Sequence, residues 1–99
     1  MYVAALRVTI RIPHAGSLKD KRSVVRHLVE ASRQRFGVSA SEVDAQDRRQ
    51  VAVLGFAVVA PSAEHAEALL TRTERFVWSH PGIDVVEVSR HWVDVEAER

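Results

Sequence analysis

The segment from His14 to Arg22 concentrates residue types that bind anions. It places a small hydroxyl side chain, Ser17, next to three cations where the chain is expected to enter a helix. Free amides at a helix N-terminus and the positive end of the helix dipole both favour a bound anion. We therefore expect phosphate contacts from six side chains on this helix and its entrance: Ser17, Lys19, Lys21, Arg22, Arg26 and Arg33.

The cations continue along the helix that follows this entrance. Between Leu18 and Phe36 there are six basic residues and two acidic ones, whereas the whole chain carries a formal net charge of only +1. Lys19, Arg22, Arg26 and Arg33 recur at steps of three to seven residues, so a phosphate backbone could lie along one exposed face. The plainer interpretation is a solvated helix face that binds nothing.

Other site chemistry has little support in the sequence. The chain has no cysteine, which excludes disulfides, thiolate catalysis and cysteine-based metal sites. Its five histidines include no His-x-x-x-His pair, and neither a Gly-x-Ser-x-Gly elbow nor a Gly-Lys-Ser/Thr phosphate loop is present. We therefore predict no catalytic residue, no cofactor and no metal.

Alternation of apolar and polar residues predicts a strand over residues 2–12, which Pro13 ends because proline cannot donate a ladder hydrogen bond. Ser17 is the predicted N-cap of the first helix: its side chain accepts from the amide of Asp20, and Asp20 reaches back to Ser17. Apolar positions at helical spacing extend to Phe36, and Gly37 provides the C-terminal cap.

The rest of the chain predicts three further strands and a second helix. Residues 38–45 suit a short, polar edge strand, and residues 51–60 are apolar on both faces, as in a central strand. A second helix follows Ser62 and stops at His80. Residues 83–95 form the last strand, where an irregular pattern predicts a bulge or a change of partner.

This order of elements predicts one α+β domain over residues 1–99 with a ferredoxin-like βαββαβ fold. Two helices cover one face of a four-stranded antiparallel sheet, with the first and third strands in the middle. The opposite face keeps valine and alanine side chains, so we predict a homodimer that covers them. No apolar run is long enough to cross a membrane, and we expect a cytoplasmic protein.

A distinctive pattern runs through the opening strand that ends at Pro13 and through residues 17–25 (Ser-Leu-Lys-Asp-Lys-Arg-Ser-Val-Val), 36–39, 42–43, 46–47, Gln50, 54–55 and 86–88. In these segments the sequence resembles the YlxP-like family of small uncharacterised bacterial proteins. The resemblance implies a ferredoxin-like fold, self-association and a link to translation, because members are often encoded beside translation initiation and ribosome maturation factors. It supplies no catalytic residues. Where members often have an aromatic residue after Gln46-Asp47, this chain has Arg48 and Arg49.

Three functions fit these observations. We favour a non-enzymatic module that binds RNA or the ribosome through the basic N-terminal part of the first helix. The alternative is a small phosphoryl or acyl-phosphate hydrolase, since acylphosphatases share this fold and hold an anion between the first strand and first helix. The glycine-rich loop that would hold the anion is missing here. The third is a structural homodimer that presents its basic helix to a protein partner.

Overall fold

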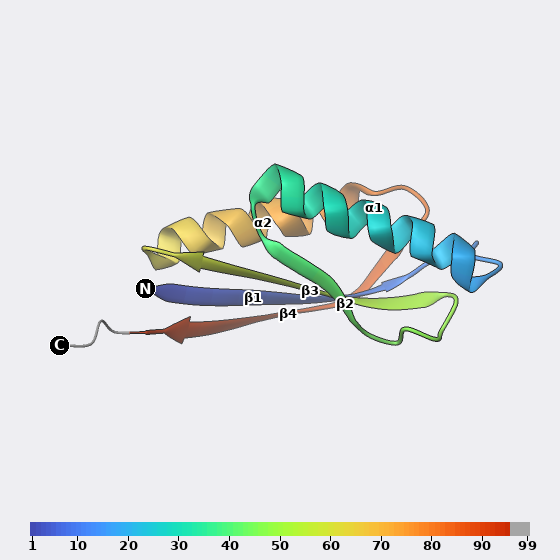
Figure 1. Ribbon diagram of the computed structural model, residues 1–99, viewed down its shortest axis with the longest axis horizontal. Coiled ribbons are helices and arrows are strands. Elements are labelled where there is room, and N and C mark those ends of the chain that lie inside the picture. The colour runs from blue at the N-terminus through green and yellow to red at the C-terminus, as the bar shows by residue number, and fades with distance from the viewer. Residues whose placement is uncertain (96–99) are drawn as a thin grey trace.

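The computed structural model describes residues 1–95, which form a four-stranded sheet with both helices on one side (Figure 1). Residues 96–99 of the predicted domain lie outside this description. Along the chain the elements are β1 (Tyr2–Arg11), α1 (Leu18–Phe36), β2 (Ser39–Asp44), β3 (Val51–Ala60), α2 (Ala63–Ser79) and β4 (Asp84–Asp94).

The strands lie in the order β2-β3-β1-β4, and every neighbouring pair is antiparallel. β1 pairs with β3 along its whole length, from Tyr2 opposite Ala60 to Arg11 opposite Val51. The predicted ferredoxin-like fold is therefore confirmed, with the two most apolar strands in the middle of the sheet.

Alternate residues of β1 point toward the helices. Leu6, Val8 and Ile10 are almost fully buried there, together with Leu54 and Phe56 of β3 and Leu28 and Leu70 of the helices. The other residues of β1 point to the open face of the sheet, which neither helix covers. Within residues 1–95, no helix is both long enough and apolar enough to cross a membrane.

Two bulges interrupt the sheet. The register between β1 and β4 shifts at Thr9 and Ile10, which confirms the irregularity predicted for the last strand. A second shift, in β2 between Glu42 and Asp44, was not predicted. It places Val43 over Gly55, where an added Cβ would lie 2.8 Å from Val43 Cγ1, so a larger residue at position 55 would displace Val43.

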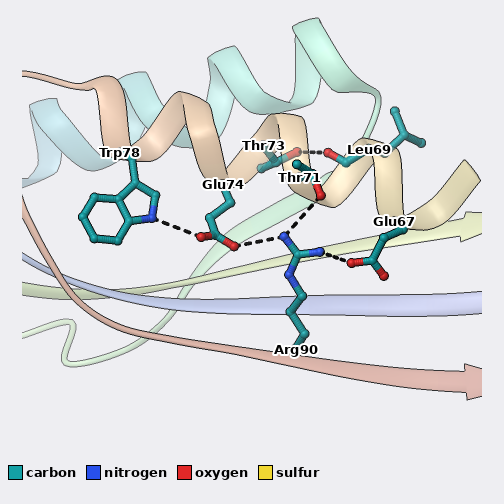
Figure 2. Close-up of polar contacts among 7 residues, drawn as sticks. All are labelled: Glu67, Leu69, Thr71, Thr73, Glu74, Trp78 and Arg90. Atoms are coloured by element: carbon teal, nitrogen blue, oxygen red, sulfur yellow. Dashed lines mark hydrogen bonds and ion pairs between the residues drawn. The ribbon is translucent and has the colours of Figure 1, made fainter. Parts of the chain in front are cut away.

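Arg90 fastens the edge strand β4 to α2 (Figure 2). Its guanidinium pairs with Glu67 and with Glu74, whose Oε1 lies 3.0 Å from Arg90 Nη2. Trp78 Nε1 donates a hydrogen bond of 3.1 Å to the other oxygen of Glu74. Arg90 thus connects the edge strand β4 to the helix layer, in addition to the backbone pairing of β4 with β1.

We expect Arg90→Leu to lower the free energy of unfolding by about 1 to 2 kcal/mol, because two charge-assisted contacts are lost from a partly exposed site. Urea unfolding measures this change. Arg72→Leu, an exposed position on α2, is the matched control and should leave the midpoint unchanged. Equal midpoints for the Arg90 variant and the wild type would show that the network adds nothing.

Candidate nucleic-acid interface

One end of the molecule brings together the end of β1, the entrance of α1 and the turn between β2 and β3 (Figure 1). Ile12 N donates to Gln50 O at 2.8 Å, and Gln50 Nε2 donates to Pro13 O at 3.1 Å. Three segments that are distant in sequence therefore meet here. We call this end of the molecule the basic end. Its exposed cations are Arg11 on the open face of the sheet, Lys19 and Arg22 on the side of α1 away from the sheet, and Arg48 and Arg49 in the turn.

Lys21 is not one of these exposed cations. Its side chain is 1% exposed, and Nζ donates to Ala45 O at 2.6 Å and to Arg48 O at 2.7 Å. Glu42 Oε2 lies 2.9 Å from Nζ, outside hydrogen-bond geometry, so this third contact acts mainly through charge. The structure contradicts the predicted phosphate contact of Lys21, because the ammonium is enclosed by oxygens of the chain itself.

The contacts of Lys21 hold the β2–β3 turn against α1. Ala45 adopts φ 58°, a left-handed conformation that costs a non-glycine residue about 1 kcal/mol. Its carbonyl in this conformation accepts one of the two hydrogen bonds from Lys21. Buried Lys21 therefore holds the backbone of the β2–β3 turn in place. It thereby fixes the backbone positions from which the side chains of Arg48 and Arg49 extend.

The entrance of α1 is capped by the chain itself. Ser17 Oγ accepts from Asp20 N at 3.1 Å, which confirms the predicted N-cap. Asp20 Oδ2 accepts from Gly16 N at 3.0 Å rather than from the expected amide of Ser17, and Ala15 N donates to Ile12 O. The amides of Ala15, Gly16 and Asp20 therefore already have acceptors within the chain, and a phosphate contact by Ser17 stays a prediction.

Three of the predicted cations, Lys19, Arg22 and Arg26, are exposed on α1. None of them has an ion pair within residues 1–95. Arg33 is exposed as well, but its Nε and Nη2 donate to Ala40 O at 3.1 and 2.6 Å and so fasten α1 to β2. It also lies fourteen residues beyond Lys19, about 21 Å along the helix. Two guanidinium nitrogens of Arg33 thus already have an acceptor within the chain, and the residue lies far from the basic end.

A hollow at the basic end is lined by three arginines that sequence reasoning did not group. Its volume is about 380 Å³. In the part of the chain described, none of these arginines has an ion pair. Guanidinium groups bind phosphate oxygens with two parallel hydrogen bonds, so such a group suits a phosphate. The lining residues are Arg11, Arg48, Arg49, Gln50 and Val51.

Within residues 1–95 no neighbouring carboxylate forms an ion pair with these arginines, including Asp84, which lies opposite Arg11 in β4. Glu42 is turned inward to Lys21, and Asp44 pairs with Arg7 on the open face of the sheet, at 3.5 Å. Asp47 lies in the same turn as Arg48 without an ion pair to it. Among residues 1–95, no group of three or more histidines and carboxylates could hold a metal ion.

Comparison with known proteins places the chain in a family. The family model described as "Protein of unknown function (DUF503)" matches residues 3–90. The chain belongs to the DUF503 family. The predicted resemblance to YlxP is also confirmed: this DUF503 chain is 36% identical to the uncharacterized protein YlxP of Bacillus subtilis (strain 168) over 78 residues, which cover 79% of the chain and 85% of YlxP.

A solved structure shares the fold of this DUF503 chain. It is described as a dimeric ferredoxin-like protein from an uncultured marine organism, and the TM-score is 0.56 at 12% sequence identity. The similarity covers 98% of the chain and 100% of the solved protein. At this identity the similarity shows the fold, and the chemistry of the DUF503 chain has to be argued from its own residues.

Proposed function

We propose that the chain binds RNA by contacting the phosphate backbone at the basic end. The observation that carries this proposal is the grouping of unpaired cations there. Lys21 holds the turn with Arg48 and Arg49 against α1, whose first turns expose Lys19 and Arg22. Because cations that release counterions from phosphates supply most non-specific affinity, this group suits a polyanion.

The spread of the cations favours a polymer over a single phosphate. Lys19 and Arg26 are seven residues apart on α1, about 10 Å along the helix, and the arginine hollow adds a second cluster. The exposed aromatic residue of β4, Trp92, pairs with Ala4, at the opposite end of β1 from Arg11. A base stacked on Trp92 would therefore lie far from Arg11. We accordingly propose phosphate contacts with little sequence preference.

The proposal predicts that Lys19→Ala/Arg22→Ala binds labelled single-stranded RNA about tenfold more weakly than the wild type at low salt. The slope of log affinity against log salt should fall by about 1.4, since each phosphate contact to a single strand contributes roughly 0.7. Fluorescence anisotropy at several salt concentrations measures both quantities. The control is Arg72→Ala/Arg75→Ala, two exposed arginines of α2. The proposal fails if both double variants bind alike.

We also propose that the chain forms a homodimer. The solved protein with the same fold is described as dimeric, and the open face of the sheet keeps exposed apolar side chains. Sedimentation over a range of concentrations should show a mass near twice the 11.1 kDa of one chain. A mass of one chain at every concentration would exclude self-association.

A further inference from the structure

Three valines lie side by side across the open face of the sheet. Val3 of β1 is opposite Val59 of β3 and also opposite Val93 of β4. Val59 is 65% exposed and Val93 is 55% exposed, so this valine row forms an apolar ridge in contact with solvent. The row lies at the end of the sheet farthest from Arg11.

Beside the valine row, small residues leave a hollow. The next two residue pairs on this face are Ala5 opposite Ala57 and Arg7 opposite Gly55. The hollow above them is about 430 Å³ in volume, and Val43 forms part of its wall. An apolar ridge of three valines thus adjoins an apolar depression on the same face.

We infer that a second copy of this chain covers the open face, with the valine row of each copy entering the hollow of the other. In a two-fold dimer the same surface is used twice, so one ridge and one hollow per chain are enough for a self-complementary contact. This inference rests on the proposed self-association and names the surface that forms it.

The size of the face fits a dimer of this kind. Three strands of ten or eleven residues and the six-residue β2, at about 3.3 Å per residue and about 4.8 Å per strand, give a face of roughly 600 Å². Each copy would cover roughly 600 Å², and the pair roughly 1,200 Å², which is the lower end of the range for stable interfaces. Interlocking of the ridge and hollow increases the contact beyond this flat estimate.

The charges of the face favour a second copy over a charged partner. Arg7 and Asp44 pair with each other within the chain, and the valine row and the alanines beside it carry no charge. His91, opposite Ala5, and Ser39, opposite Ala57, are polar neighbours of the hollow, whereas the carboxylate Glu87 lies opposite Thr9, nearer the basic end. The valine row and Arg11 therefore lie at opposite ends of the open face.

Val59→Lys tests the surface, because a charge in the ridge would be buried in the dimer but exposed in the monomer. We expect the dissociation constant of the dimer to rise by about 100-fold or more, since two such charges are buried per dimer. Val86→Lys is the matched control: Val86 is 56% exposed in the bulge of β4, outside the valine row, and should change dimerisation little. Circular dichroism checks that both variants are folded.

Because the chain has no cysteine, a single introduced thiol gives an independent measurement. Alkylation of Ala57→Cys should slow as the protein concentration rises through the dissociation constant, whereas Ala68→Cys on the exposed side of α2 should react at a constant rate. A wild type that is monomeric throughout would overturn both the self-association and this surface. If Val59→Lys still dimerises and the thiol of Ala57→Cys is alkylated at the same rate at every protein concentration, the chains associate through a different surface.

Discussion

Lys21→Met is expected to lower the free energy of unfolding by about 3 kcal/mol, because it removes one partner of a buried ion pair. The Glu42 side chain is 18% exposed, and its Oε2 has no hydrogen-bond partner to compensate for the lost ammonium. The carbonyls of Ala45 and Arg48 lose their donor at the same time. Urea unfolding followed by circular dichroism measures the loss.

Lys19→Met is the matched control for this experiment, since it makes the same chemical change at an exposed position two residues earlier. It should alter stability by no more than about 0.5 kcal/mol. Adding Glu42→Leu to Lys21→Met should restore part of the loss, because the isolated carboxylate is then removed. A Lys21→Met protein as stable as the wild type would show that the contacts of Lys21 do not stabilise the fold.

Arg11→Ala/Arg48→Ala/Arg49→Ala is expected to weaken RNA binding by about 100-fold or more at low salt. Removing three phosphate contacts should also reduce the salt slope by about 2. The loss should exceed that of the α1 double variant, because the three guanidinium groups line one hollow and can act on one stretch of backbone. Fluorescence anisotropy with the same labelled RNA measures it.

All three arginines are exposed. Their removal should therefore leave the midpoint of urea unfolding close to that of the wild type. That comparison separates lost contacts from lost folding. The Arg72→Ala/Arg75→Ala protein again serves as the control for loss of exposed positive charge. Retained affinity in the triple variant, or an equal loss in the control, would remove the hollow from the proposed interface.

The fold was predictable because the two central strands carry strong local patterns. Residues 2–12 alternate and residues 51–60 are apolar on both faces, which suits strands that lie inside a sheet with helices on one side. The bulge at Val43 was not predictable in this way. β2 has six residues, most of them polar, so one extra residue leaves no visible break in its pattern.

Lys21 shows where reasoning from residue type failed. Its residue type predicts an exposed cation, yet its spacing from Val25, Leu28 and Ser32 places it on the buried side of α1. Spacing alone therefore indicated burial. Its oxygen partners come from residues 42–48, more than twenty positions later, and no local pattern predicts such a contact.

The arginine hollow depended on strand pairing. Antiparallel pairing of β1 and β3 places Arg11 opposite Val51, and therefore beside the turn that carries Arg48 and Arg49. The predicted fold already contained that neighbourhood in outline. The exact strand register and the hydrogen bond from Ile12 to Gln50 place the three arginines around one hollow. Both depend on tertiary packing, which a local sequence pattern does not predict.

The proposed function requires the basic end to bind the phosphate backbone of RNA. The most direct test is the affinity of the wild-type protein for single-stranded RNA as a function of salt concentration. Five cations at the basic end predict a slope of log affinity against log salt of about −3.5, by roughly 0.7 per contact. No binding at low salt, or an affinity that does not change with salt, would contradict the claim.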